Sequence, residues 1–325
     1  MGPDDDHRAS VMRDERSTRV EGGTWPLVSA VIPTRDRPLL MRRAVESVLA
    51  QKYPGRVECI IVFDQSEVLL PQIDVPEGFE LRAITNERTP GLAGARNTGA
   101  LGAKGEFLAF CDDDDEWLPD KLRRQVDRLS RDPDAVAVSS GVFVESRGRT
   151  IERVPPMDHV GFEDLLVSRQ MELHSSNLLV RLSDFTGRVG LIDEELPGSQ
   201  NEDYDWLLRA ARHGSIGIVR DPLVRIHWQS SWFSERWPTL IAAHLYLLKR
   251  YPEFQNSPRG LARMYGQIAF YEAASGDLGS ARNWASRSLR ANWRERRAYL
   301  ALAVSYRFVS AKRVVGWANR AGKGI

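Results

Sequence analysis

The sequence predicts an α/β protein with a Rossmann-like, mostly parallel sheet flanked by helices, followed by an all-helical C-terminal extension. Up to about residue 232, short apolar runs alternate with helical patterns, an order that gives a parallel sheet with right-handed crossovers. Beyond that point the pattern is nearly all helical, and Pro238, Pro252 and Pro258 stand near expected helix ends.

The chain is predicted to have three parts: a disordered leader (1–25), the α/β domain (26–232) and a helical domain (233–325). The leader mixes charges with almost no apolar content and lacks the apolar core of a signal peptide. With 325 residues, 42% of them hydrophobic, the chain can bury a large core without disulfides. No apolar run approaches the length of a membrane span.

Apolar runs place the strands, and apolar residues at spacings of three and four place the helices. The run 57–63 is nearly continuous, as expected of a strand buried on both faces. In chain order, we expect strands at 27–32, 57–63, 81–85, 107–111, 135–144, 177–181, 216–219 and 223–227. Helices are expected at 37–51, 92–103, 118–129 and 204–213.

In the helical part, residues 261–293 have the spacing of small and aromatic side chains found in one tetratricopeptide repeat. A solenoid needs several such repeats, so we expect a helical hairpin packed on the main domain. If 299–320 is one helix, its apolar residues share a face and its arginines add positive charge. That face could lie on a membrane surface or pack on the preceding helices.

Charge and cysteine content suggest the protein's surroundings. The net charge is +1, but 281–325 holds 11 Lys and Arg against one acidic residue, Glu295. Such a tail is either a solvated helical face or a surface for anionic lipid or an acidic partner. Cys59 and Cys111 lie in strand-like runs, which predicts buried thiols in a reducing compartment. We expect a cytoplasmic protein, with peripheral contact at the inner face of the membrane as an alternative, and no nucleic-acid partner.

Four consecutive aspartates, Asp112 to Asp115, follow the run 107–111 directly. Their like charges repel, so they need solvent or a hard divalent cation to compensate them. Ligands in open α/β sheets bind at the carboxyl ends of strands, where this cluster falls. The pattern favours Mg²⁺ or Mn²⁺ binding, although Asp115 or Glu116 could simply cap the following helix.

A second acidic motif runs from Asn201 to Trp206 at the start of a predicted helix. Its carboxylates could cap the helix or supply a fixed general base that faces a cleft.

Two loops have the residues expected of a nucleotide-binding site. The loop 33–37 joins a strand to a helix and contains basic groups, and the small residues of 91–97 open a helix N-terminus towards anionic oxygens.

In order along the chain, these motifs resemble glycosyltransferase family 2. They are Val28-Ser-Ala-Val-Ile-Pro-Thr-Arg-Asp-Arg37, Cys59-Ile-Ile-Val-Phe-Asp-Gln-Ser66, Gly91-Leu-Ala-Gly-Ala-Arg-Asn-Thr-Gly99, Gly105-Glu-Phe-Leu-Ala-Phe-Cys-Asp-Asp-Asp-Asp115 and Asn201-Glu-Asp-Tyr-Asp205. The resemblance covers roughly 27–232 and departs at Phe63, where the family usually has Asp. It implies a GT-A fold, a nucleotide diphosphate sugar donor, a divalent cation (Mn²⁺ or Mg²⁺) and inverting transfer of a hexose-like sugar to an acceptor hydroxyl.

The resemblance also implies a set of site residues. It makes Asp203 the catalytic base and places the metal ligands at Asp112, Asp114 and His227. The residues expected to bind the donor nucleotide are Pro33, Thr34, Arg37, Asp64, Arg96, Asn97, Asp112 and Asp113. On the acceptor side we expect His174, Ser175, Ser176, Glu202 and Trp206, and the acceptor is a glycan, a glycolipid or a small molecule.

Three other functions stay open from the sequence. The chain could be a non-catalytic nucleotide-sugar or glycan-binding protein on the same scaffold. It could be a scaffold protein that acts through its helical part. A nucleotidyltransferase, which would release pyrophosphate from a nucleoside triphosphate, also pairs a metal with a nucleotide.

Overall fold

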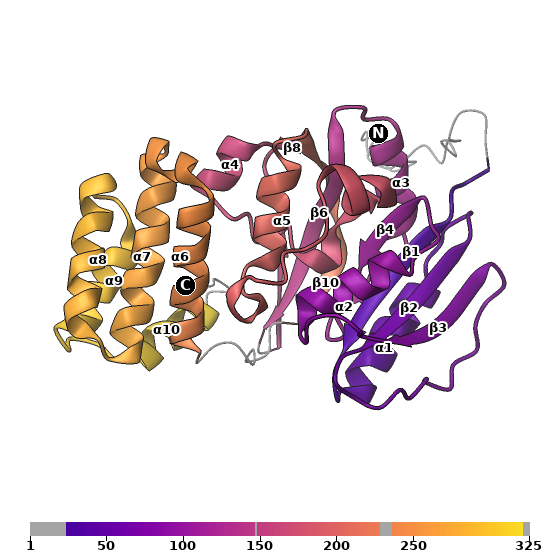
Figure 1. Ribbon diagram of the computed structural model, residues 1–325, viewed down its shortest axis with the longest axis horizontal. Coiled ribbons are helices and arrows are strands. Elements are labelled where there is room, and N and C mark those ends of the chain that lie inside the picture. The colour runs from indigo at the N-terminus through magenta and orange to yellow at the C-terminus, as the bar shows by residue number, and fades with distance from the viewer. Residues whose placement is uncertain (1–23, 147, 228–235, 321–325) are drawn as a thin grey trace, which may run out of the picture.

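The computed structural model describes residues 24–146, 148–227 and 236–320, without the side chains of residues 319 and 320. A ten-stranded sheet with flanking helices forms one end of the molecule, and a stack of helices forms the other (Figure 1). Nearly all of the predicted leader lies outside the described residues, and so does the predicted domain boundary at residue 232.

One half of the sheet is wholly parallel. Its strand order is β3-β2-β1-β4, and its strands are β1 (Val28–Thr34), β2 (Val57–Phe63), β3 (Phe79–Thr85) and β4 (Phe107–Phe110). Every residue of β1 and β2 is buried, as the continuous apolar runs predict. The crossovers carry α1 (Pro38–Leu49) and α2 (Leu92–Leu101).

The other half of the sheet is mixed. β9 (Leu179–Arg181) lies antiparallel between β4 and β6 (Ala135–Ser146), and β6 runs parallel to the long β10 (Ser215–His227). Short antiparallel strands complete it: β5 (Glu116–Trp117), β7 (Arg149–Arg153) and β8 (His159–Val160). The longest ladders are parallel, which confirms the predicted mostly parallel α/β class.

Alternate residues of the strands supply two apolar cores, one on each face of the sheet. Val31 and Ile60 pack on one face, which α2 and α5 (Glu202–Ala210) cover. Ala30 and Ile61 pack on the other face, under α1 and α3 (Lys121–Ser130). α5 therefore lies on the same face as α2, and this brings the second acidic motif towards the first.

The structure corrects several predicted elements. The strands expected at 216–219 and 223–227 are one strand, β10, whose register shifts around Pro222. The helix expected from residue 118 begins at Lys121, because Glu116–Trp117 pairs with β10 instead. The prediction missed β7, β8 and α4 (Phe162–Val167), which are too short to give a periodic pattern.

The helical extension contains α6 (Trp237–Arg250), α7 (Pro258–Ser275), α8 (Leu278–Ala291), α9 (Arg296–Ser305) and α10 (Ala311–Arg320). A short 3₁₀ turn, Pro252–Asn256, joins α6 to α7. The expected hairpin is α7 and α8, joined through Gly276, whose φ of 99° suits a residue without Cβ. Small side chains such as Ala269, Ala281 and Ala285 let these helices pack closely.

The single helix considered for 299–320 is in fact two helices. α9 ends at Ser305, and Arg307 has a φ of 63°, which breaks the helix before α10 begins at Ala311. Val314 is 2% exposed in the core of the extension, so one face of α10 packs on its neighbours.

Cys59 and Cys111 are buried free thiols, as predicted. Within the described residues, none of the helices is both long and apolar enough to span a bilayer.

Candidate functional site

The predicted site residues gather at the end of the sheet formed by the carboxyl ends of the parallel strands β1 and β4. The aspartate cluster follows β4 directly. Because β9 is antiparallel to β4, its first residue, Leu179, pairs with Ala109 near the end of β4. The 3₁₀ turn η1 (Ser175–Asn177), which precedes β9, is thereby brought beside the aspartates.

The first loop after β1 holds the middle of the aspartate cluster. The Thr34 hydroxyl donates to Asp113 Oδ2 at 2.8 Å, and Arg37 Nη1 donates to Asp113 Oδ1 at 3.1 Å and to Asp114 Oδ2 at 3.3 Å. The Asp113 side chain is 8% exposed, whereas that of Asp114 is 43% exposed. Asp114 is therefore the carboxylate of this pair that a ligand can reach from solvent.

Arg96 joins the two acidic motifs. It is 1% exposed, and its guanidinium donates to Asp112 Oδ1 at 2.6 Å and to Glu202 Oε1 at 2.5 Å. It also donates to the Ser175 hydroxyl at 2.9 Å, and Ser175 donates to Asp112 Oδ2 at 3.2 Å. Burial would lower the pKa of Arg96, but the carboxylates of Asp112 and Glu202 raise it, so Arg96 stays a fixed cation between the motifs.

A second group of contacts surrounds Asp115. The Ser176 hydroxyl donates to Asp115 Oδ2 at 2.6 Å and accepts from the Asp112 backbone N–H at 3.0 Å. His174 lies between two carboxylates, with Nε2 3.7 Å from Asp112 Oδ2 and Nδ1 3.5 Å from Asp115 Oδ2. One ligand atom each from Asp112, Asp115 and His174 lie within 4.8 Å of one another, which is close enough to share a metal ion.

Burial disfavours the ionised form of three carboxylates in the cluster, those of Asp113, Asp114 and Asp115. Burial raises the pKa of Asp113 to about 6 and that of Asp115 to about 7. Burial and the Asp112 carboxylate also raise the pKa of Asp114 above its usual value. Burial alone would lower the pKa of His174, but Asp115 and Asp112 raise it. A cation bound beside these carboxylates would therefore favour their ionised forms.

The three residues predicted as metal ligands are arranged differently from one another. Asp112 belongs to the group of three just described. The carboxylate of Asp114 contacts Arg37 instead. His227, the last residue of β10, places Nε2 2.5 Å from Glu116 Oε1, while its backbone N–H donates to Asp115 Oδ1 at 3.3 Å. His227 therefore lies at the border of the cluster.

Asp203, the predicted base, is near the start of α5 and is 6% exposed. Arg169 Nη2 donates to both of its oxygens, at 2.8 and 2.9 Å, and Arg169 Nη1 donates to Asn201 Oδ1 at 2.8 Å. Burial would raise the pKa of Asp203, but Arg169 lowers it below its usual value. Asp203 is therefore ionised and fixed in orientation.

The remaining nucleotide-side residues lie at the ends of β1, β2 and α2. Asp64 follows β2 and accepts from the Gly91 backbone N–H at 3.0 Å and from Asn86 Nδ2 at 2.8 Å. Pro33 is a buried residue of β1. Both amide atoms of Asn97 bond to the backbone of Ile192, and its amide N also donates to Glu194, so this side chain ties α2 to the segment 191–196.

Trp206 faces inward from α5. Its ring stacks on Phe185 with centroids 5.5 Å apart, and its indole N–H donates to Gly190 O at 3.0 Å. With Asp203 and Ser175 it lines a small, largely apolar pocket completed by Phe110, Leu178, Val180, Phe185 and Ile192. The structure thus brings the predicted base and the predicted acceptor-side residues Ser175 and Trp206 around one pocket.

Sequence reasoning missed Arg169, which no motif marks because it lies on the connection between α4 and η1. It also left capping of the following helix open as a role for Asp115, which is 2% exposed beside His174. A possible signal for Arg169 was the requirement that a buried carboxylate in α5 have a cationic partner.

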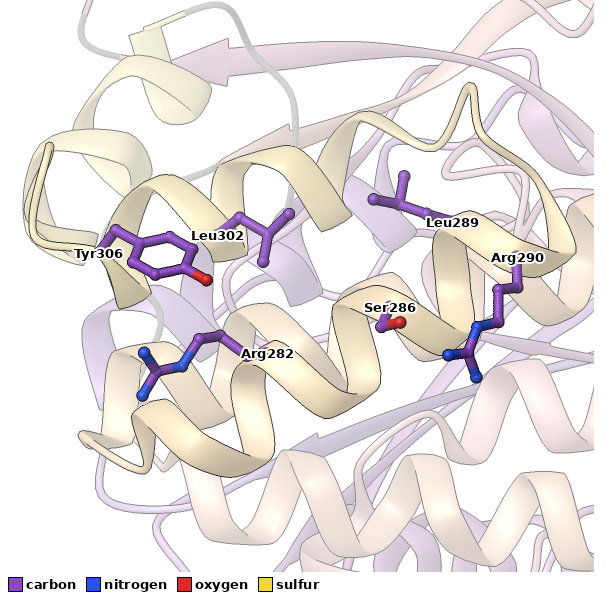
Figure 2. A pocket seen from close by; sticks show the side chains of 6 residues that line it. All are labelled: Arg282, Ser286, Leu289, Arg290, Leu302 and Tyr306. Atoms are coloured by element: carbon purple, nitrogen blue, oxygen red, sulfur yellow. The ribbon is translucent and has the colours of Figure 1, made fainter.

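A second concavity lies in the helical extension, away from the acidic cluster. Figure 2 shows its lining: Arg282, Ser286, Leu289 and Arg290 come from α8, Leu302 comes from α9 and Tyr306 follows α9. The Arg282 guanidinium stacks 5.3 Å from the Tyr306 ring. None of the predicted site residues lies in this groove.

A sequence-family model described as glycosyl transferase family 2 matches residues 29–189. Similar curated proteins include an uncharacterized glycosyltransferase of Rickettsia typhi, 29% identical over 62% of this chain and 64% of that protein. The putative colanic acid biosynthesis glycosyl transferase WcaA of Escherichia coli K12 is 38% identical over 30% of this chain and 36% of its own length. The chain therefore spans less than two thirds of the length of these relatives.

Solved structures with the same fold cover nearly the whole chain. S. aureus TarS 1–349 in complex with UDP-GlcNAc has a TM-score of 0.57 at 16% identity, over 91% of this chain and 92% of that chain. The mannosyltransferase PcManGT from Pyrobaculum calidifontis, in complex with GDP-Man and Mn²⁺, has a TM-score of 0.50 at 17% identity, over 89% and 86%. The fold is thus that of GT-A glycosyltransferases, and residues 29–189 match glycosyl transferase family 2.

Proposed function

We propose that the chain transfers a sugar from a nucleotide diphosphate sugar to an acceptor hydroxyl, with inversion at the anomeric carbon. The observation that supports this most strongly is the buried chain of contacts from Asp112 through Arg96 to Glu202. It fixes the acidic cluster and the start of α5 relative to each other, as a reaction between a donor and a base requires.

In this proposal Asp203 accepts the proton of the acceptor hydroxyl as its oxygen attacks the anomeric carbon and the bond to the diphosphate breaks. Arg169 keeps the Asp203 carboxylate ionised and oriented. A general base of this kind contributes about 10²–10⁴-fold to the rate. We propose that the acceptor hydroxyl approaches Asp203 from the side of Ser175 and Trp206, which line a largely apolar cavity beside it with room for little more than one water molecule.

The residues of the cluster fit a divalent cation. The ligands are hard carboxylate oxygens, and burial and the Asp112 carboxylate raise the pKa of Asp114, so a cation bound beside it would favour its ionised form. We propose that Asp112 and Asp114 hold Mn²⁺ or Mg²⁺, with His227 and the His174 side chain beside them. A bound cation there would neutralise the charge that develops on the diphosphate leaving group. Thr34, Arg37 and Asp64 lie where the nucleotide would reach the strand ends.

Two similar proteins support a nucleotide-sugar donor. The TarS structure contains UDP-GlcNAc, and the WfgD protein of Escherichia coli, 32% identical over 103 residues, is named as a UDP-Glc glucosyltransferase acting on a diphosphoundecaprenol-linked sugar. A UDP-hexose donor is accordingly our first choice, and a lipid-linked glycan is the first acceptor to test.

The test is a screen of nucleotide sugars by thermal stabilisation with and without Mn²⁺, followed by assays of nucleoside diphosphate release with candidate acceptors. Ligand at a hundred times its Kd should add about 2.7 kcal/mol to the unfolding free energy. Binding without turnover on any acceptor would favour a non-catalytic nucleotide-sugar-binding protein. Release of pyrophosphate from a nucleoside triphosphate would favour a nucleotidyltransferase.

We also propose peripheral contact between α10 and an anionic membrane surface. Lys312 and Arg313 are exposed on α10, and Trp317 and Phe308 are 52% and 84% exposed. Basic residues near such a surface contribute roughly 1 kcal/mol each, and exposed aromatics suit the headgroup region. Packing of Val314 in the extension core leaves only the outer face of α10 available for lipid.

Sedimentation with anionic and neutral liposomes tests this contact. Salt-sensitive binding to anionic vesicles should be lost in the double variant Lys312→Glu/Arg313→Glu, which leaves the buried Val314 in place. Equal binding by this variant and the unaltered chain, or no binding by either, would mean that α10 serves the core alone.

A further inference from the structure

The helical extension packs directly against the helix that carries Asp203. α5 lies between the sheet and the extension (Figure 1). Ala243, Leu247 and Tyr251 of the first part of the extension belong to the same buried cluster as Tyr204 and Leu207 of α5. The apolar core that supports α5 is therefore completed by the extension.

The residue directly after Asp203 is bonded to the extension. Arg263 of α7 donates from Nη2 to the Tyr204 hydroxyl at 2.7 Å, and that hydroxyl donates to Leu165 O of α4 at 2.6 Å. Arg263 is 8% exposed and Tyr204 is 1% exposed, so water does not replace this contact. Breaking a buried bond to a charged donor has a larger effect than breaking an exposed one.

The next residue of α5 is bonded to the extension as well. The carboxylate of Asp205 accepts from the Tyr251 hydroxyl at 2.7 Å and from Arg250 Nε at 3.1 Å. Asp205 and Tyr251 are both 0% exposed. Two consecutive positions on α5 are thus held from the extension, and together they fix the rotation of the helix about its axis.

The contact between α7 and the backbone of α4 also restricts sliding of the extension along the domain. Gly260 of α7 lies so close to α4 that a Cβ at this position would be 2.3 Å from Leu166 O. Arg263, one turn later, reaches Leu166 O as well, at 3.4 Å. α7 is consequently docked against backbone rather than against adjustable side chains.

We propose that the helical extension positions the catalytic base, with Arg263 and Tyr251 as positioning residues that orient α5 and, through it, the Asp203 carboxylate. This inference rests on the proposed role of Asp203. Arg263 bonds Tyr204 and Tyr251 bonds Asp205, so both act on Asp203 through its neighbours on α5. Because a displacement of about 1 Å can reduce a rate about a hundredfold, a small rotation of α5 would lower kcat.

The experiment compares matched pairs of variants. Arg263→Met removes the bond to Tyr204, and Arg287→Met removes a similar Arg–Tyr bond inside the extension, from Arg287 Nη2 to the Tyr265 hydroxyl at 3.0 Å. Tyr251→Phe removes the hydroxyl that bonds Asp205. Tyr246→Phe removes a hydroxyl of α6, the helix that Tyr251 follows, which donates to Asp193 Oδ2 at 2.7 Å. The four proteins are assayed for kcat, for KM of the donor and for amide hydrogen exchange in α5.

We expect Arg263→Met to lower kcat by about tenfold or more and Tyr251→Phe to lower it severalfold, with the donor KM unchanged within a factor of about two. Arg263→Lys should restore part of kcat. Exchange in residues 202–210 should increase in both variants but not in their controls. Equal kcat and equal exchange in each variant and its matched control would overturn the positioning role.

The exchange measurement separates this proposal from the proposed function. If no donor and acceptor pair gives turnover, or if Asp203→Asn retains full kcat, the assignment of the base fails. Increased exchange in α5 of Arg263→Met would still show that the extension orders this helix. If Arg263→Met does not fold, the comparison of Tyr251→Phe with Tyr246→Phe tests the positioning role instead.

Discussion

The two acidic segments of the site differ in how the protein stabilises their carboxylates. In the cluster after β4, burial raises the pKa of Asp113 to about 6 and that of Asp115 to about 7, and Asp114 shares one guanidinium with Asp113. At the start of α5, Asp203 has Arg169 on both of its oxygens, and its pKa is lowered. Burial holds the pKa values of the cluster carboxylates above their usual range, whereas Asp203 is paired with its own arginine and has a lowered pKa.

This difference separates two kinds of chemistry. Neighbouring buried carboxylates that share few cationic partners suit a site that binds a divalent cation. A carboxylate with a fixed cationic partner stays ionised and cannot rotate, which suits a base that must meet one hydroxyl. The variants below test each half of this comparison, in order of decreasing expected effect.

Asp114→Ala should have the largest effect. It removes the most exposed carboxylate of the cluster, so we expect kcat to fall by more than about a hundredfold and donor binding in Mn²⁺ to weaken strongly. Isothermal titration with the donor, with Mn²⁺ and with EDTA, measures this. Asp120→Ala, which removes an exposed carboxylate just beyond the cluster, is the control. An Asp114→Ala protein with unaltered turnover and metal dependence would refute the metal assignment.

Asp203→Asn should lower kcat by about 10²–10⁴-fold with little change in donor affinity, because the amide keeps the shape of the side chain but does not accept the proton. Steady-state kinetics together with donor titration gives the two quantities. A joint loss of donor binding and thermal stability would instead make Asp203 a structural residue and move the base to a neighbour such as Glu202.

Arg169→Met should have a smaller effect on the rate and a specific effect on its pH dependence. Without Arg169, burial raises the pKa of Asp203, so the acidic limb of the kcat/KM profile should move to higher pH. The lost pair should lower the unfolding free energy by on the order of 1–3 kcal/mol at neutral pH, since Arg169 is 35% exposed. Asp203 contributes this stability above its unfolded pKa, and it is lost as pH falls through the folded pKa.

Arg42→Met is the matched control, because it removes an exposed ion pair with Glu46 on α1. Its pH profile should coincide with that of the unaltered protein. If Arg169→Met keeps its acidic limb at the original pH, Arg169 does not set the basicity of the group that limits turnover.

How well the sequence predicted each region depends on how far apart along the chain the interacting residues lie. Buried strands such as β2 and the hairpin of α7 and α8 depend on local patterns, so their apolar runs and their glycine turn predicted them. The acidic motifs were visible because like charges in a row are costly without a ligand. In both cases the signal lay within a few neighbouring residues.

The partners of those motifs come from far along the chain and could not be predicted in the same way. Arg96 meets Glu202 across 106 positions, and Arg169 meets Asp203 across 34. The same holds for His174, which reaches Asp115 only because β9 runs antiparallel to β4. The raised pKa values in the aspartate cluster and the pairing of Asp203 with Arg169 are therefore results of the topology.

The last prediction concerns a second buried cation, Lys121, which contrasts with Arg169. Its amine is 0% exposed, donates to Gln125 Oε1 at 2.8 Å and lies 4.1 Å from the centroid of the Trp117 ring. Among the described residues no carboxylate forms an ion pair with it, and burial lowers its pKa to about 7. Below pH 7 the folded protein must therefore hold an unpaired buried charge.

Lys121→Met should remove this cost. The folded pKa of about 7 lies below the ordinary value of 10.5, so the folded state binds fewer protons than the unfolded state between these values, and the stability of the unaltered protein rises with pH across that window. Relative to the unaltered protein, the variant should gain stability on the order of 1–2 kcal/mol at pH 6, and the gain should shrink towards pH 10. Urea unfolding at pH 6, 8 and 10 measures it, with exposed Lys249→Met as the control for loss of a positive charge. A difference between Lys121→Met and the unaltered protein that stays constant with pH would show that burial does not lower the pKa of Lys121 in the folded state.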